Sequence, residues 1–398
     1  MPLQTLPCRA FQRGFALGAR LLPWRTPTVL SGAGSLLKLP DVFSREGASR
    51  PLVVASRRQC ADERFLALRA ALEGRGIRPS IFSGVEPDPS VATVEKLAAQ
   101  YRADGCDSFL VLGGGSPIDA AKVAAARVVR PDKTVGQLGG LLKVRRPLPL
   151  FIAVPTTAGT GSEATIAAVV TGEEHRKYAV SDLCLIPRYA VLDPTLTLSL
   201  PPAVTAQTGM DALTHAVEAY LSLYYNTRET RALAESAVRD IFRYLPVACR
   251  DGQSLTARER MLRASFDAGC AFTRASVGNV HAIAHTLGGL YGIPHGLACA
   301  VTLPVVLEDY GAAVHPHLAR LGSLIGLTGT ERERAIGLLA AIRALNASLG
   351  IPDRFDGIRG EDLPRMAAWA AAEANPVYPV PVVYDQARFR RVLERLRA

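Results

Sequence analysis

The chain has 398 residues, of which 48% are hydrophobic and 21% are charged, and its formal net charge is +10. This length predicts two domains, and this composition excludes a disordered or fibrous protein. The basic residues are mostly scattered arginines without a basic run that interleaves aromatics, which argues against nucleic-acid binding, and no apolar run approaches the roughly 20 residues of a membrane span.

The first 40 residues contain no acidic residue and carry Arg9, Arg13, Arg20 and Arg25. Mitochondrial transit peptides have this composition. We favour a basic amphipathic helix over residues 8–22 on the protein's own surface, because no linker separates it from the first predicted strand. The chain has no CxxC pair and an odd number of cysteines, which predicts reduced thiols in a cytoplasmic protein; they lie at positions 8, 60, 106, 184, 249, 270 and 299.

From residue 27 to about residue 200, short apolar runs alternate with helical patterns. We expect strands at 27–32, 51–56, 79–84, 108–116 and 148–157, and helices at 63–74, 90–104 and 119–129. This alternation is typical of a doubly wound parallel sheet that binds ligands at the carboxyl ends of its strands.

Beyond residue 200 we find almost only helical periodicity. Helices are expected at 203–223, 229–249, 256–275, 277–289, 297–310, 314–325, 330–348, 361–374 and 385–397. We therefore expect an α/β domain over residues 1–200, with 1–26 as a basic extension, and an all-helical domain over 201–398.

The segment VLGGGSPIDAAK (111–122) has a glycine-rich turn between a strand and a helix. Glycines allow the backbone to approach a ligand closely, and Ser116 and Pro117 suit the N-cap and the first helical position. The N–H groups of such a helix start bind pyrophosphate. The segment matches neither GxGxxG nor a Walker A loop, so a plain strand-to-helix turn is the alternative.

A second loop, VPTTAGTGSEAT (154–165), also follows a strand and combines two glycines with the hydroxyl residues Thr156, Thr157, Thr160, Ser162 and Thr165. Alone it could be a polar surface turn, but two such loops at consecutive strand ends favour a dinucleotide. After the strand at 51–56, an acidic residue would bind the ribose of NAD. Here Ser56 precedes Arg57 and Arg58, which favours NADP.

Four of the seven histidines lie in two short segments, GMDALTHAVEAY (209–220) and VHAIAHTLGGLYGIPHG (280–296). Asp211 with His215, and His281 with His285, are spaced i and i+4, which places each pair on one helix face; His295 follows. Single helical histidines are more often structural, but this concentration predicts a zinc or ferrous iron site. The spacing alone does not decide which histidine is not a ligand. Such a metal polarises a carbonyl or lowers the pKa of an alcohol, while a nicotinamide exchanges the hydride.

Four motifs in this order, GGGSPIDAAK, PTTAGTGSE, GMDALTHAVEAY and HAIAHTLGGLYGIPHG, resemble those of the iron-containing (group III) alcohol dehydrogenases from about residue 27 to the carboxyl end. The resemblance implies an α/β dinucleotide-binding domain and an all-helical metal-binding domain, as in dehydroquinate synthase, with the active site in the cleft between them. It implies that the metal ligands are Asp211, His215, His281 and His295, and that His285 relays a proton. It implies that the cofactor is bound by Gly114, Gly115, Ser116, Thr156, Thr157, Thr160 and Lys177.

Two positions depart from the family pattern. Relatives that use NAD commonly have Asp where this chain has Ser56, and the family's Cys before an Asn-Pro pair is absent from AAAEANPVYPVP (370–381). We expect an oxidoreductase that transfers a hydride between NAD(P) and a small alcohol or aldehyde, with Fe²⁺ or else Zn²⁺, as a homodimer or larger homo-oligomer. The alternatives are a maleylacetate reductase, a hydroxyacid-oxoacid transhydrogenase, a dehydroquinate synthase-like lyase, and a degenerate binding protein.

Overall fold

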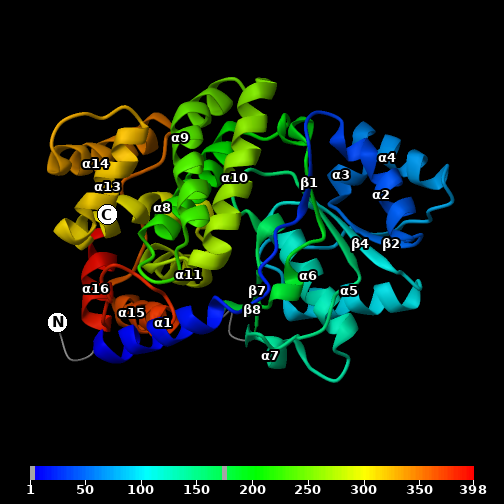
Figure 1. Cartoon of the computed structure of the whole chain (residues 1–398), viewed down its shortest axis with the longest axis horizontal. Coiled ribbons are helices and arrows are strands. Elements are labelled where there is room, and N and C mark those ends of the chain that lie inside the picture. The colour runs from blue at the N-terminus through cyan, green and yellow to red at the C-terminus, as the bar shows by residue number, and fades with distance from the viewer. Residues whose placement is uncertain (1–4, 173–176) are drawn as a thin grey trace. The chain divides into compact units, whose positions relative to one another are not determined.

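The computed structural model describes residues 5–172 and 177–398 (Figure 1). Its contacts define two compact units. One comprises Pro23–Ser199, and the other comprises Leu200–Ala398 together with the described N-terminal residues up to Leu22. The N-terminal helix α1 (Thr5–Ala19) therefore packs with the helical unit and not with the α/β unit with which the sequence grouped it. Its buried stripe of Cys8, Gln12 and Ala16 explains this packing.

A parallel sheet forms the centre of the α/β unit, as predicted, but it has six strands, and the strand at Tyr189–Leu192 was not among the five predicted. Its strand order is β1 (Thr28–Ser31), β9 (Tyr189–Leu192), β6 (Leu150–Pro155), β4 (Ser108–Gly113), β2 (Pro51–Val54) and β3 (Ser80–Phe82). All residues of β2 and β4 are buried, which suits strands covered on both faces. The strand order reverses between β2 and β4, and doubly wound sheets bind ligands beside such a reversal.

Helices cover both faces of this sheet. One core cluster joins Phe109 and Phe151 to the helices α5 (Val91–Ala103) and α6 (Gly115–Val129). The other joins Leu110 and Ile152 to α2 (Leu39–Glu46) and α4 (Glu63–Glu73). The short helices α3 (Arg57–Cys60) and α7 (Val135–Leu138) follow the second strand and α6.

A small second sheet was not predicted. It contains β5 (Gly140–Leu141), β8 (Lys177–Ser181) and β7 (Ala167–Thr171), with β7 and β8 antiparallel. These strands are short, and β7 alternates between half-buried and buried residues. The apolar run IAAVV (166–170) contains most of β7, but no strand was predicted there.

Helix α6 begins earlier than predicted. Gly114 is the N-cap in an extended conformation, so Gly115, Ser116 and Pro117 form the first helical turn. The prediction that Ser116 is the N-cap and Pro117 the first helical residue is wrong. Proline is tolerated here because N–H groups in the first turn have no acceptor inside the helix. The Ser116 hydroxyl instead accepts a hydrogen bond from the backbone N–H of Asp88 at 3.3 Å.

Every helix predicted beyond residue 200 is present. Their bounds are α8 (Pro202–Leu221), α9 (Arg228–Arg250), α10 (Leu255–Ala275), α11 (Asn279–Tyr291), α12 (His295–Tyr310), α13 (His315–Leu324), α14 (Glu331–Ser348), α15 (Leu363–Ala374) and α16 (Gln386–Arg395). Helix α8 is buried at every residue from Gly209 to Leu221, and α9, α10 and α12 pack against it. This central helix carries two of the candidate metal ligands.

Within the described residues, His295–Leu324 is long and apolar enough to cross a membrane by length and composition alone. The expectation that no apolar run approaches this length is therefore wrong. Of the apolar window in this stretch, 67% is buried inside the protein. This stretch is apolar because it belongs to the protein core, where α12 packs on α8 and α11.

Candidate active site

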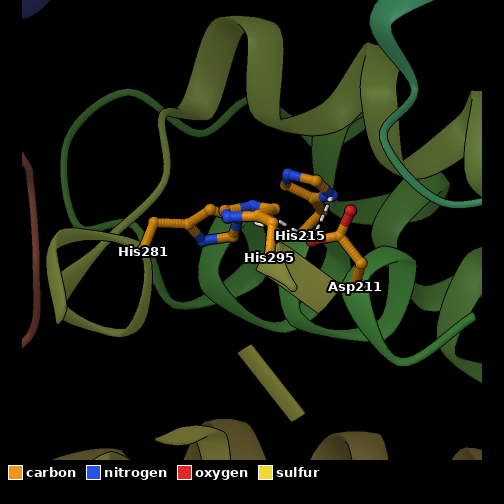
Figure 2. Close-up of side chains that lie close together, drawn as sticks. All are labelled: Asp211, His215, His281 and His295. Carbon is orange, nitrogen blue, oxygen red and sulfur yellow. Dashed lines mark ion pairs between the residues drawn. The ribbon is translucent and has the colours of Figure 1, made fainter. Parts of the chain in front are cut away.

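Asp211, His215, His281 and His295 come together in the helical unit (Figure 2). The first two project from α8, His281 projects from α11, and His295 is the first residue of α12. One ligand atom from each lies within 4.8 Å of all the others. Oδ1 of Asp211 lies 3.8 Å from Nδ1 of His215, 3.9 Å from Nε2 of His281 and 3.4 Å from Nε2 of His295. Three imidazoles thus converge on one carboxylate oxygen.

Glycines permit the close approach of the helices that carry these ligands. Gly292 ends α11 with a φ of 63°, a left-handed conformation in which glycine is not strained, and the chain turns there toward His295. A Cβ atom on Gly296 would lie only 2.3 Å from the backbone oxygen of Gln207 in α8. The start of α12 therefore passes directly against α8, which brings His295 to Asp211.

Because these four side chains are close together and largely buried, their arrangement is energetically unfavourable unless a cation binds them. Desolvation raises the pKa of Asp211 to about 7 and lowers that of His281 to about 3. Among the described residues, Oδ1 of Asp211 and Nε2 of His281 are buried without a hydrogen-bond partner. Such buried polar atoms normally find one. One carboxylate oxygen and three imidazole nitrogens are ligands that suit Fe²⁺ or Zn²⁺, so the residues fit a divalent metal ion.

Glu218 holds His281 in place and had no predicted role. Its Oε2 lies 2.6 Å from Nδ1 of His281 and accepts from the backbone N–H of Gly278 at 2.8 Å, while its Oε1 accepts from the N–H of Val280 at 2.8 Å. A carboxylate bound to Nδ1 directs Nε2 toward a metal. The signal was present in the sequence, because Glu218 lies seven residues after Asp211 on the same face of α8.

His285 lies beside the four-residue group without belonging to it. Its ring centroid is 5.3 Å from that of His295, and its Nδ1 lies 2.7 Å from Oε1 of Glu373 in α15. Its side chain is 20% exposed, whereas that of His281 is 3% exposed. Glu373 had no sequence signal, since it follows an alanine run. This position suits a proton relay better than a metal ligand.

The two predicted cofactor loops contact each other at the carboxyl ends of β4 and β6. The N–H of Thr156 donates to the backbone oxygen of Gly113 at 2.9 Å. A Cβ atom on Gly114 would lie 3.1 Å from Oγ1 of Thr157, and one on Gly115 would lie 2.9 Å from Cγ2 of Thr160. The glycines therefore allow these loops to pack tightly.

Ser56 and Lys177 are linked to the same loops. Ser56 is exposed and caps α3, where it accepts from the N–H of Gln59; the Gln59 side chain then donates to Oγ1 of Thr156 at 3.0 Å. Lys177 in β8 forms an ion pair of 2.6 Å with Asp88, whose N–H donates to Oγ of Ser116. The cofactor residues implied by the resemblance thus gather in the α/β unit.

Lys122 and Asp119 of α6 form hydrogen bonds with the second cofactor loop and with β7, which follows it. The sequence did not suggest this role. Nζ of Lys122 donates to the backbone oxygen and Oγ1 of Thr165, at 2.8 and 3.0 Å, and to the oxygen of Ala167 at 3.1 Å. Asp119 accepts from the hydroxyl of Ser162 and from the N–H of Val169. Burial lowers the pKa of Lys122 to about 8, while the two carboxylates, Asp119 and Glu163, act in the opposite direction.

Comparisons with known proteins agree with this geometry. The sequence profile of the iron-containing alcohol dehydrogenases matches residues 26–194, and that of the Fe-containing alcohol dehydrogenase family, C-terminal, matches residues 205–395. A 1,3-propanediol dehydrogenase of Klebsiella pneumoniae is 42% identical over 312 residues, which cover 76% of this chain and 80% of that protein.

Two solved structures share the whole fold. That of a 1,3-propanediol oxidoreductase has a TM-score of 0.89 and 34% identity, and covers 95% of this chain and 100% of its own. Sulfoacetaldehyde reductase from Bifidobacterium kashiwanohense, in complex with NAD⁺, has a TM-score of 0.83 and 28% identity, and covers 94% of this chain and 98% of its own.

The two profile matches follow the order of the two units and leave only α1 and short segments outside them. The predicted architecture and the predicted oxidoreductase class are confirmed. The relatives imply a small alcohol or aldehyde as substrate and a nicotinamide cofactor. The chain belongs to the iron-containing alcohol dehydrogenase family.

Proposed function

We propose that this protein interconverts a small primary alcohol or diol and the corresponding aldehyde, with Fe²⁺ held by Asp211, His215, His281 and His295. The convergence of three imidazole nitrogens on one buried carboxylate oxygen carries this proposal. The similarity to two proteins named for 1,3-propanediol supports a short, uncharged substrate.

When bound, the ion polarises the substrate oxygen, and the nicotinamide accepts or donates the hydride. The residues of the chain bind the ion and orient the groups that react. Glu218 fixes the ring of His281, and Asp211 supplies the single negative charge among the four ligands. Glu373 engages Nδ1 of His285, so that Nε2 of this ring carries the lone pair that takes the hydroxyl proton during alcohol oxidation.

We propose NADP as the preferred cofactor. Ser56, Arg57 and Arg58 are exposed after β2 and include no carboxylate. The next carboxylate along the chain, Asp62, is engaged by the guanidinium of Arg64. Two exposed cations beside a strand end that carries no carboxylate favour the additional phosphate of NADP.

The test combines metal analysis with turnover. Purified protein is loaded with Fe²⁺ or Zn²⁺ and assayed with 1,3-propanediol, simple primary alcohols and their aldehydes, using each nicotinamide cofactor. We expect a net change in NAD(P)H that requires the metal, and we expect His281→Ala to lose both metal and turnover. His315→Ala, in the same unit but outside the group, is the control. Activity in metal-free protein would overturn the mechanism. Substrate consumption without a net change in NAD(P)H would indicate the lyase.

A further inference from the structure

The loop between α15 and α16 lacks some of the backbone N–H groups that could donate hydrogen bonds to its own backbone oxygens. It contains Pro376, Pro379 and Pro381, which have no N–H to donate. Its oxygen atoms therefore need donors from elsewhere, because buried backbone oxygens are almost always hydrogen-bonded. The loop matters to the site because it begins two residues after Glu373, the partner of His285.

Helix α1 supplies donors for four of these oxygens. The fully buried side chain of Gln12 donates to the backbone oxygens of Pro376 and Tyr378, at 3.0 and 2.7 Å. The guanidinium of Arg9 donates to those of Val380 and Pro381, at 2.7 and 2.9 Å, and also to Oε1 of Gln12 at 2.9 Å. Figure 1 draws α1 in blue beside α15 and α16.

Tyr378 connects this loop to His285. Its hydroxyl donates to Oε1 of Glu373 at 2.7 Å, and the same oxygen lies 2.7 Å from Nδ1 of His285. Burial raises the pKa of Tyr378 well above its usual value, so the hydroxyl keeps its proton and remains a donor. Gln12 thus holds the backbone of Tyr378 by a hydrogen bond, and the hydroxyl of the same tyrosine is hydrogen-bonded to the carboxylate of Glu373, which contacts His285.

We propose that Arg9 and Gln12 of α1, with Tyr378 and Glu373, are positioning residues that hold the ring of His285 with the proton on Nδ1. This inference rests on the proposed function, in which His285 moves the substrate proton. Helix α1 precedes residue 26, where the first family profile begins, so this arrangement includes a part of the chain outside the shared family sequence. It also requires that α1 stays attached to the working enzyme.

The first test compares full-length variants by kcat, KM and metal content. We expect Tyr378→Phe and Gln12→Ala each to lower kcat about tenfold, because misorientation of a reacting group costs catalysis, while metal content and the KM for cofactor stay unchanged. Arg13→Gln is the matched control, since Arg13 is exposed on α1 and lies over the ring of Tyr224. A merely structural helix would lower the melting temperature and leave kcat intact.

A double-variant comparison separates this inference from the proposed function. In a His285→Asn background, Tyr378→Phe should cause no further loss of kcat. If His285→Asn lowers kcat but Tyr378→Phe and Gln12→Ala do not, the positioning role is overturned and the proposed function stands. If His285→Asn keeps full kcat, the proton relay and the positioning role both fall.

A readout without turnover completes the test. With ¹⁵N-labelled histidine each of the seven rings gives two nitrogen signals, and His285→Asn identifies the pair from His285. In zinc-loaded protein at alkaline pH, where imidazole is neutral, we expect this ring to show a single tautomer with the proton on Nδ1. Tyr378→Phe and Gln12→Ala should shift it toward a mixture. An unchanged tautomer in both variants would overturn the proposal.

Discussion

Glu218 and His281 form a short contact behind the metal ligands: Oε2 of the carboxylate lies 2.6 Å from Nδ1 of the ring. The opposite nitrogen, Nε2, lies 3.9 Å from Oδ1 of Asp211. Glu218 is itself fixed by two backbone N–H groups from the turn that begins α11. The orientation of this ligand is therefore set before any ion binds, and by a residue that does not face the ion.

We predict that Glu218→Gln weakens metal binding about 10- to 100-fold, the usual effect of removing a carboxylate behind a ligating histidine. The amide nitrogen of glutamine cannot accept, so either His281 and the N–H of Gly278 both lose their acceptor or the N–H of Val280 loses its own. The measurement is the dissociation constant for Zn²⁺ by competition with a chelator. The control is Glu235→Gln, which removes a carboxylate paired with Arg320 at the protein surface. Equal affinity in the Glu218 variant and the wild type would contradict this role.

The contact between the cofactor loops gives a second prediction. In Gly115→Ala, the new methyl group would lie 2.9 Å from Cγ2 of Thr160, so the Thr160 side chain or its loop must shift. We expect the KM for the nicotinamide cofactor to rise at least about tenfold, while metal content stays unchanged. Gly136→Ala is a suitable control, because its nearest neighbour outside the adjoining residues lies 3.9 Å away. A normal KM for Gly115→Ala would show that the loops do not bind the cofactor tightly.

The metal ligands were predictable in part from the sequence. Asp211 and His215 are polar residues i and i+4 in an otherwise apolar helix, and such residues require a partner. Spacing could not choose between His285 and His295, because His281 pairs with His285 at the same interval. In the structure the two histidines differ because Nδ1 of His285 contacts Glu373, which lies 88 residues further along the chain. Contacts between distant residues of this kind leave no periodic signal.

Five of the six strands of the main sheet and all the C-terminal helices followed from apolar runs and helical periodicity. The small sheet did not: no strand was predicted at IAAVV (166–170), although Ala168, Val170 and Val180 are buried in the same core cluster as the main sheet. The packing of α1 on the helical unit was equally hidden. It depends on Gln12 and Arg9 donating to a loop more than 360 residues away, which no local pattern reveals.

We expect a single substitution at Ser56 to change the preference of the protein between NADP and NAD. We predict that Ser56→Asp lowers kcat/KM with NADPH more than about tenfold and raises it with NADH, since a carboxylate accepts from the ribose hydroxyl and repels a 2′-phosphate. The measurement is the ratio of kcat/KM for the two cofactors. Aspartate also caps helices, so α3 should persist. Wild-type protein that already prefers NADH would contradict the proposed preference for NADP.

Lys122 should be essential to the stability of the α/β unit. In Lys122→Met, the carboxylates of Asp119 and Glu163 lose their buried cation, and the oxygens of Thr165 and Ala167 lose a donor. Leaving buried acceptors without a donor costs about 1–3 kcal/mol for each group. We expect a clear fall in melting temperature, in contrast to Lys96→Met, which alters an exposed lysine on α5. A melting temperature equal to that of the wild type would contradict this role.

Glu163 should make stability depend on pH in the opposite sense from a surface carboxylate. Burial raises its pKa from 4.5 to about 7, so the folded protein holds a proton that the unfolded chain releases. Its stabilising contribution is complete below pH 4.5 and is lost as the pH rises through 7, with an upper bound of about 3 kcal/mol. Glu163→Gln keeps the shape and removes the titration.

The variant should therefore melt higher than the wild type near pH 8, by about 2–4 °C for each kcal/mol recovered, and the difference should shrink toward pH 5. Lys122, the charged group that acts on Glu163, and Asp119, which also acts on Lys122, are present in both proteins, so their own titration largely cancels in the comparison. The measurement is the difference in melting temperature between variant and wild type across this pH range. A difference independent of pH would mean that Glu163 is already ionised in the folded protein, held so by the ammonium of Lys122.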